Sequence, residues 1–154
     1  MFCRSFVARL FPCVAYASEN MNAEKLLVWL LRLSGVMLLF ALPASFLSNA
    51  QMDAIHRATG LGQLPSAPIV EYLTRSASWL YAFHGLLLLL ISRDLPRYLS
   101  LVRFLAILSV IFGAGMIGLD VFAAMPLPWI IGEGPFIIAL GLAFLLLADR
   151  CSLR

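Results

Sequence analysis

Four apolar stretches take up most of this 154-residue chain, and each is about long enough to cross a lipid bilayer. A hydrocarbon core about 30 Å thick needs about 20 helical residues, because an α-helix rises about 1.5 Å per residue. Lipid offers the backbone no hydrogen-bonding partner, so a crossing segment must satisfy its own N–H and C=O groups as a helix. The sequence therefore predicts an all-α fold, a membrane-spanning four-helix bundle with antiparallel neighbours. The expected spans cover residues 26–46, 72–91, 101–124 and 129–148.

The composition agrees with a membrane protein and excludes a water-soluble fold. Hydrophobic residues make up 62% of the chain and charged residues 12%, against about 25% charged in an average soluble domain. The remaining segments are too short for a second domain, so residues 21–154 are expected to form one four-span domain. The net charge of +3 comes from residues at span ends, not from a patch that would bind nucleic acid. The expected partners are the lipid bilayer and a second copy of the chain or a larger membrane complex.

The first 20 residues differ from the rest and leave two interpretations open. They combine arginines, cysteines and aromatic residues, and Pro12 breaks an apolar run that is too short to span. One interpretation is a disordered tail, or an extension upstream of a true start at Met21. The other is a cleaved signal peptide, with Arg4 as its charged region and Ala15-Tyr16-Ala17 as its cleavage site.

Lysine and arginine residues are unevenly distributed between the two ends of the spans. The N-terminal side, the connection between the second and third spans, and the C-terminus are basic, whereas the other two connections are nearly free of positive charge. Cytoplasmic loops carry an excess of lysine and arginine. The pattern predicts a multi-pass inner (plasma) membrane protein with both termini in the cytoplasm. The residues on the basic side are Arg4, Arg9, Lys25, Arg93, Arg97, Arg103, Arg150 and Arg154.

The connections carry local signals of their own. Residues 51–59 are expected to form a short helix on the outer surface, ended by Gly60 in a left-handed conformation. Residues 93–97 are expected to form a tight turn, since Pro96 disfavours helix at the residue before it. The connection at 125–128 is so short that the third and fourth spans must be antiparallel neighbours.

Polar residues inside the spans are the candidate functional residues. A charge at the bilayer centre costs about 2.5–3.5 kcal/mol on insertion scales, so such residues usually pair or carry a function. Arg75, Asp120 and Glu133 fall at about the same depth below the outer surface, on three different spans. The sequence predicts that they form an intramembrane polar cluster.

Three interpretations of this cluster remain open. In the first, it is a small outward-opening pocket, in which Asp120 and Glu133 exchange protons and Arg75 binds an anion or acts as a counter-ion. In the second, the three residues form a structural ion-pair network that fixes the helix register. In the third, Arg75 and Glu133 extend to the lipid headgroups without pairing.

His84 is a secondary candidate, near the middle of the second span and on the helix face opposite Arg75. A haem or metal ligand would need a partner at the same depth, and the only other histidine, His56, is in the outer loop. We expect a neutral His84 that hydrogen-bonds across helices, and no metal or cofactor. Cys3, Cys13 and Cys151 form no C-x-x-C pair, and no catalytic motif is recognisable, so an enzyme is not the favoured interpretation.

The third and fourth spans contain features that affect helix packing. Gly132-Glu133-Gly134-Pro135 opens the fourth span, and a helix that began only at Pro135 would be too short to cross, so we expect a kinked helix from Pro128. The small residues Ala114 and Gly118 of the third span could mark a dimer contact, although packing within the bundle is the expected use.

The chain resembles a known family over residues 21–150, and two motifs are the most distinctive parts of this resemblance. They are Tyr81-Ala82-Phe83-His84-Gly85 and Gly132-Glu133-Gly134-Pro135. With the order of the spans, they resemble a family of uncharacterised bacterial four-helix integral membrane proteins. In layout only, the chain is also similar to the DoxX-like proteins. The resemblance implies an integral membrane protein and assigns no catalytic residue.

Three functions remain open on this evidence. The favoured one is a non-enzymatic accessory or structural membrane subunit, which predicts a dry bundle with an apolar interface. The second is a small proton-coupled transporter with an outward-facing Arg/Asp/Glu pocket. The third is an intramembrane enzyme that acts on a lipid or quinone through a lateral opening between helices.

Overall fold

The computed structural model describes residues 12–152, and within that range every regular element is a helix. The all-α prediction is therefore confirmed. The elements in chain order are α2 (Pro12–Leu39), the short 3-10 helix η1 (Leu42–Phe46), α3 (Asn49–Ala58), α4 (Pro68–Ile91), α5 (Leu95–Phe122) and α6 (Leu127–Ser152).

Three segments of the described chain are long and apolar enough to cross a membrane: Met21–Phe46, Leu95–Phe122 and Leu127–Cys151. They correspond to the first, third and fourth expected spans, which suggests a multi-pass membrane protein. α4 has 24 residues but is not among them. Its first half carries Arg75 and two serines, and its second half carries the imidazole of His84; these polar groups lower its hydropathy.

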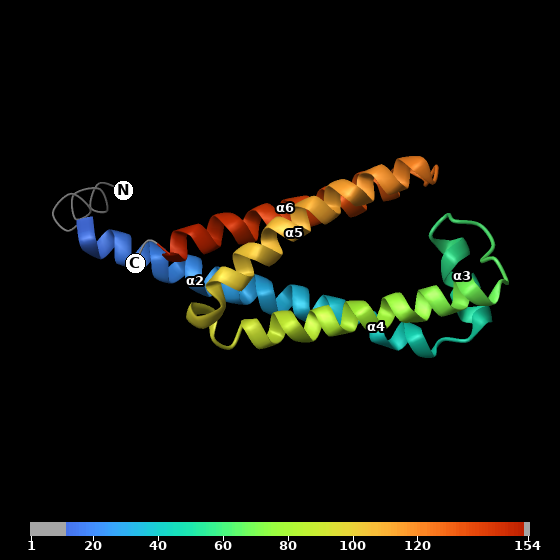
Figure 1. The fold of residues 1–154 in the computed structure, drawn as a ribbon, viewed down its shortest axis with the longest axis horizontal. Helices are drawn as coiled ribbons and strands as arrows, with labels where there is room; N and C mark the ends of the chain where they lie inside the picture. Colours follow the sequence, from blue (N-terminus) through green and yellow to red (C-terminus); the bar gives the residue numbers. More distant parts are fainter. Residues whose placement is uncertain (1–11, 153–154) are drawn as a thin grey trace.

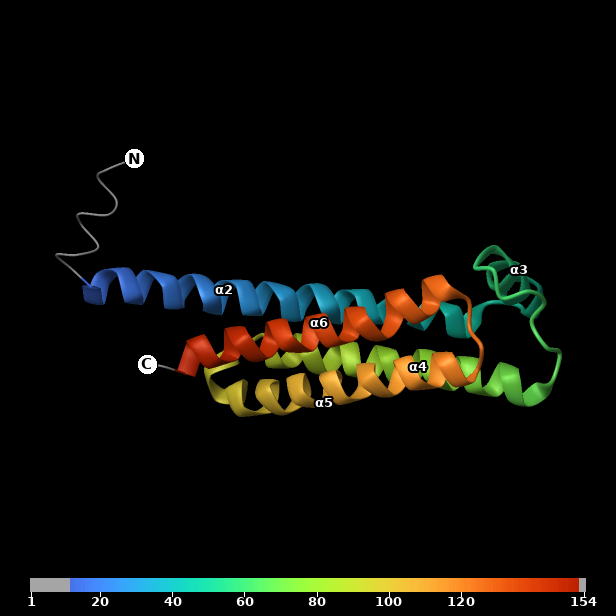
Figure 2. The same cartoon turned by 90° about the horizontal axis from the view of Figure 1, so that it is seen from above.

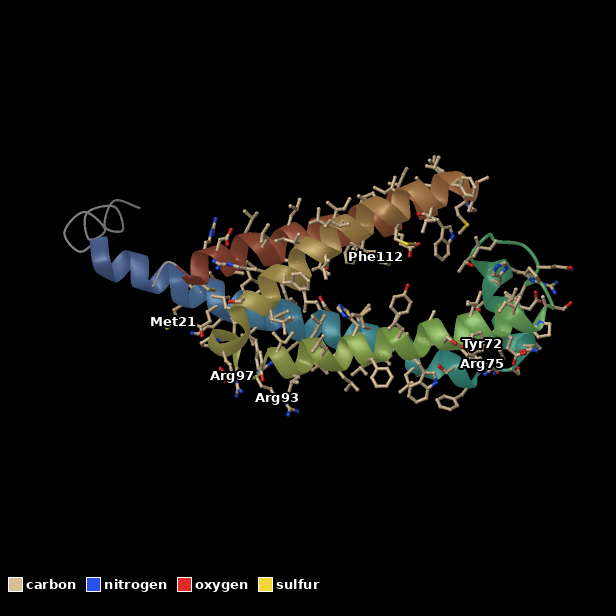
Figure 3. All side chains as sticks on the ribbon, in the orientation of Figure 1. Met21, Tyr72, Arg75, Arg93, Arg97 and Phe112 are labelled. Atoms are coloured by element: carbon tan, nitrogen blue, oxygen red, sulfur yellow. The ribbon has the colours of Figure 1, made fainter. Side chains whose placement is uncertain are left out.

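The long helices form two antiparallel hairpins (Figures 1 and 2). α2 packs against α4, and α5 packs against α6, which confirms that the short connection at 125–128 joins antiparallel neighbours. α2 and α6 join the two hairpins, whereas α4 hardly contacts α5. The hairpins diverge toward the end that carries α3. Figure 3 labels Arg93 and Arg97 at the α4–α5 turn, and Tyr72 and Arg75 near the opposite end of α4.

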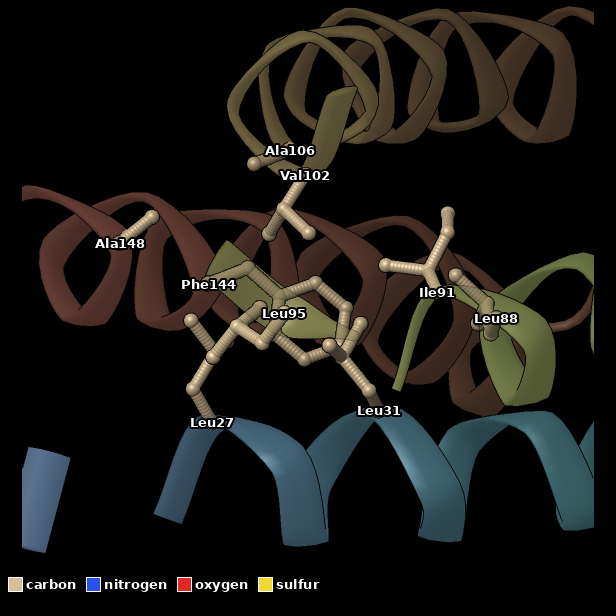
Figure 4. Close-up of a cluster of buried hydrophobic side chains, with 9 residues drawn as sticks. All are labelled: Leu27, Leu31, Leu88, Ile91, Leu95, Val102, Ala106, Phe144 and Ala148. Atoms are coloured by element: carbon tan, nitrogen blue, oxygen red, sulfur yellow. The ribbon is translucent and has the colours of Figure 1, made fainter. Parts of the chain in front are cut away.

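The buried hydrophobic core lies at the end where the hairpins meet (Figure 4). Leu27 and Leu31 of α2 are fully buried, at 0% and 1% exposure. All four long helices contribute to this core, so the hairpins are fixed to each other at the end where α4 is joined to α5. The core side chains are Leu27, Leu31, Leu88, Ile91, Leu95, Val102, Ala106, Phe144 and Ala148.

Glycines set the closest approach of α2 and α4. A Cβ atom on Gly85 would lie 2.6 Å from the carbonyl oxygen of Gly35. Ala114 and Gly118 of the third span were expected to pack within the bundle, and this expectation was wrong. A side chain at Gly118 would meet open space, and Ala114 is exposed. The packing glycine of α5 is Gly113, which is buried.

The short helix expected at residues 51–59 is confirmed, with bounds one or two residues from those expected, and its place on the outer surface remains a prediction. A capping box opens α3: the Ser48 hydroxyl accepts a hydrogen bond from the Gln51 N–H, and the Gln51 side chain accepts one from the Ser48 N–H. Gly60 follows the helix with φ +81°, the left-handed conformation predicted for it.

One expected boundary was wrong. The turn expected at residues 93–97 is shorter, because Asp94 caps α5 and Pro96 lies in its first turn, where the missing N–H costs nothing. α2 begins at Pro12, upstream of the candidate span Met21–Phe46, which contains the first expected span. Residues 1–11 lie outside the described residues, so the tail and the signal peptide both remain predictions. α6 starts at Leu127 and continues through Pro135, as the span-length argument predicted.

Candidate functional site

The guanidinium group of Arg75 lies among backbone carbonyls and does not join Asp120 or Glu133. It donates hydrogen bonds to the carbonyl oxygens of Ser45 and Leu47, the latter at 3.1 Å. It also pairs with the Glu71 carboxylate one turn earlier on α4, at 2.8 Å. The expected three-residue cluster is therefore corrected: Arg75 ties η1 and the chain after it to α4.

Helix spacing and chain geometry explain this position. Glu71 and Arg75 are four residues apart and so face each other on α4. Carbonyls at the end of a helix have no partner within it, and an arginine fork can serve several at once. The other Glu71 oxygen accepts a hydrogen bond from Asn49 at 3.2 Å, which extends the network to α3. The i, i+4 pair was visible in the sequence, whereas the bonds to η1 were not.

Asp120 is the most buried charged residue among those that the structure describes. Its exposure is 4%, and its Oδ2 atom has no hydrogen-bond partner within the described chain. Asp120 lies in the last turn of α5, where its backbone carbonyl accepts the Met125 N–H at 2.9 Å. Ala124 holds a left-handed φ of +52° beside it. The carboxylate is thus close to the negative end of the α5 dipole, which does not favour a negative charge.

The structure brings Glu133 close to Asp120. Glu133 lies in the second turn of α6 and is partly exposed. The two carboxyl groups are near enough for their charges to repel. Glu133 also interacts electrostatically with Tyr81 of α4, although Tyr81 belongs to the other hairpin. The candidate site is therefore an acid pair within the α5–α6 hairpin.

An acid pair of this kind suits proton chemistry. Two nearby carboxylates that are both ionised repel each other, and a single shared proton removes the repulsion. The unpartnered oxygen of Asp120 can donate a hydrogen bond when protonated or accept one from a visiting group. Arg75 bonds to Glu71 and to the carbonyls of Ser45 and Leu47, so it is not the cation of the anion site that was expected beside the acids.

His84 is half-buried on α4, in the same helix as Tyr81. Within residues 12–152, no three histidine, cysteine, aspartate or glutamate side chains gather as a metal site would require. Sequence analysis left the role of His84 open, and it remains a prediction that the imidazole bonds across helices.

A polar cluster that sequence analysis missed organises the loop between η1 and α4. Asp53 accepts hydrogen bonds from the Arg57 guanidinium and from the Leu64 N–H at 2.8 Å. These bonds, the one from Arg57 first, lower the pKa of Asp53 below its usual value. At the end of the loop helix, the Trp129 indole donates to the Thr59 carbonyl at 3.4 Å, which links α6 to α3. The i, i+4 spacing of Asp53 and Arg57 was the available signal.

Comparisons with models of protein families, with curated proteins and with solved structures gave no match to this chain. The assignment of a function therefore depends on the chemistry of the residues described above.

Proposed function

We propose that the chain is a four-span protein of a bacterial-type inner membrane with both termini in the cytoplasm. α4 is the span that needs an argument, because its composition alone does not require it to cross. It packs along α2, a candidate span, with the close Gly35–Gly85 contact between them. A helix packed lengthwise on a spanning partner lies at the same depth. The basic residues at the α4–α5 turn support the orientation.

We further propose that Asp120 and Glu133 bind and release a proton, as in a small proton-coupled carrier. The observation that carries this proposal is the Asp120 carboxyl group, which is 4% exposed, has no partner for Oδ2 in the described chain and interacts electrostatically with the carboxyl group of Glu133. Burying an ionised carboxylate without a partner costs free energy. Protonation removes this cost because it neutralises the group. The position at the α5–α6 turn places this site near the outer surface in the proposed orientation.

Infrared difference spectroscopy tests this proposal on the full chain in lipid nanodiscs. Stepping the external pH between about 3 and 8 brackets ordinary carboxyl pKa values, and the infrared absorption of a protonated carboxyl group is distinct from that of an ionised one. We expect an intramembrane carboxyl signal that Asp120→Asn and Glu133→Gln each alter, because the charges of the two groups interact. Asp53→Asn, outside the pair, serves as the matched control. An unchanged signal in both site variants would contradict the proposal.

Transport itself needs a second measurement. Proteoliposomes that enclose a pH-sensitive dye, with an imposed pH gradient, should show proton entry. Asp120→Asn should slow this entry by about 100-fold or more, the range typical of losing a proton-transfer group. Wild-type protein that passes no more protons than empty liposomes would leave the acid pair as a static feature and would reject the carrier.

A second candidate, the accessory subunit, is favoured by one uncovered face of α5. Ile111, Gly115, Gly118 and Phe122 follow each other at helical spacing, and Phe122 is 91% exposed. Side chains at the two glycines would meet open space, so another helix could approach closely there. Native mass spectrometry of the purified chain should then show a stoichiometric second protein that Gly118→Leu removes and Gly132→Leu retains. A monomer in mild detergent would count against this candidate.

A further inference from the structure

One exposed face of α2 changes from cationic to apolar along the helix. Lys25, Trp29 and Arg32 are spaced by four and three residues, so they lie on the same side. All three are exposed, and Trp29 is 59% exposed. Together with three neighbours they line an open groove of about 490 Å³; the lining residues are Met21, Glu24, Lys25, Val28, Trp29 and Arg32.

The same face continues as an apolar stripe. Leu33 and Val36 are 44% exposed and Phe40 is 72% exposed, one after another along the next two turns. From Lys25 to Phe40 the stripe is about 22 Å long, at about 1.5 Å per residue. A cationic end followed by about two turns of apolar surface has the polarity of an extended phospholipid, with a charged headgroup and an acyl chain.

The α4–α5 turn fixes the depth of the cationic end. Arg32 Nε donates a hydrogen bond to Ser92 Oγ at 3.4 Å, and Arg93 follows Ser92 in that turn as a further exposed cation. Arg32 therefore lies at the level where α4 ends, and Lys25 lies about 10 Å farther from the bilayer centre. Tryptophan is enriched at this depth, where its ring meets the headgroups.

We propose that this face of α2 binds an anionic phospholipid, with the phosphate headgroup between Lys25 and Arg32 and an acyl chain along Leu33, Val36 and Phe40. Two cations outweigh the single carboxylate of Glu24 in the groove, and Arg93 adds a third positive charge nearby. Charge complementarity therefore favours an anionic over a zwitterionic lipid. The proposal rests on the proposed membrane placement and is independent of the acid pair.

Native mass spectrometry of the full chain in mild detergent tests the proposal, with phosphatidylglycerol and phosphatidylcholine titrated separately. We expect phosphatidylglycerol to bind at least about 10-fold more tightly, since each basic residue near an anionic surface contributes about a fivefold gain. Lys25→Gln combined with Arg32→Gln should remove this preference. Lys25→Gln alone should weaken it about fivefold and leaves the Arg32–Ser92 contact in place, so a folding defect is separated from lost binding.

Arg97→Gln combined with Arg150→Gln is the matched control. It removes the same charge from the same end of the molecule, outside the groove, and should change the preference by less than about twofold if the groove is specific. Equal binding of both lipids, or equal loss in the two double variants, would overturn the proposal. Displacement of the lipid by inorganic phosphate at equal concentration would also overturn it, because the acyl chain would then contribute nothing.

The lipid proposal and the proton proposal can fail separately. Asp120→Asn should keep the preference for phosphatidylglycerol while it alters the infrared carboxyl signal. A variant that lost both would contradict the independence of the two sites.

Discussion

Gly113 and Gly134 bring the backbones of α5 and α6 into direct contact. A Cβ atom on Gly113 would lie 2.8 Å from the carbonyl oxygen of Gly134, and one on Gly134 would lie 2.7 Å from that of Gly113. In lipid, where apolar burial gives helices no driving force to associate, such close packing is a main source of stability. The contact holds together the hairpin that carries Asp120 and Glu133.

Gly134→Ala should therefore destabilise the fold by about 1–3 kcal/mol, the usual cost of overpacking. The new methyl group would overlap the Ile117 side chain and the Gly113 backbone, and the backbone cannot move aside cheaply. Gly118→Ala is the control, because its methyl group meets open space and should leave stability equal or slightly higher. Equilibrium unfolding in mixed micelles measures both, and equal losses would contradict the close approach.

Ala124→Gly should stabilise the end of α5 by about 1 kcal/mol. Ala124 holds φ +52°, a conformation that costs a residue with a Cβ about 1–2 kcal/mol and glycine almost nothing. Its N–H bonds the Val121 carbonyl, and the next N–H bonds that of Asp120, which is the usual glycine-capped helix end. Ala123→Gly, one residue earlier at φ −80°, should not stabilise. Thermal unfolding compares the two, and the opposite order would refute this account of the turn.

Arg75→Gln should loosen the segment around η1. The guanidinium group bonds two carbonyls there, and hydrogen bonds to a charged group contribute about 1.5–3 kcal/mol each. Amide hydrogen exchange of residues 42–47 should accelerate by about 10-fold or more. Glu71→Gln, which removes only the ion pair, should have a smaller effect, because the carbonyl contacts remain. Equal acceleration in both variants would indicate that the ion pair, not the carbonyl contacts, holds the segment.

The outer loop should open at low pH. The pKa of Asp53 is lowered in the folded protein by the Arg57 hydrogen bond first and by the Leu64 N–H second. Its stabilising contribution is therefore fully present above the unfolded pKa of about 3.9 and is lost as pH falls through the lower folded value. Proteolysis of the loop by an acid-active protease should accelerate below about pH 4. Asp53→Asn should abolish this pH dependence; if the dependence persisted, another group would be responsible.

The elements that sequence analysis predicted well are those set by local signals. Gly60 marks the end of α3 because its left-handed conformation excludes most other residues, and the connection at 125–128 is too short for anything except an antiparallel hairpin. The start of α5 was predicted too late because of Pro96. Proline disfavours helix at the residue before it, but it is also well suited to the first turn of a helix.

The candidate site was harder to predict, because it depends on which helices are neighbours. Equal depth along the membrane suggested that Arg75, Asp120 and Glu133 would meet. α4 packs on α2 and hardly contacts α5, so Arg75 is surrounded by η1 and the chain after it. Asp120 and Glu133 lie on helices joined by a short connection, and their proximity follows from that connection alone.

The most direct test of the four-span account is cysteine labelling in intact cells, with the native cysteines replaced by serine. Ser66 precedes α4 and Ser100 lies in the early turns of α5, and both are exposed. If α4 crosses in the proposed orientation, a membrane-impermeant thiol reagent should modify Ser66→Cys and leave Ser100→Cys unmodified until the cells are lysed. Labelling at both positions in intact cells would place α4 outside the bilayer, and labelling only at Ser100→Cys would reverse the orientation; either result would contradict the account.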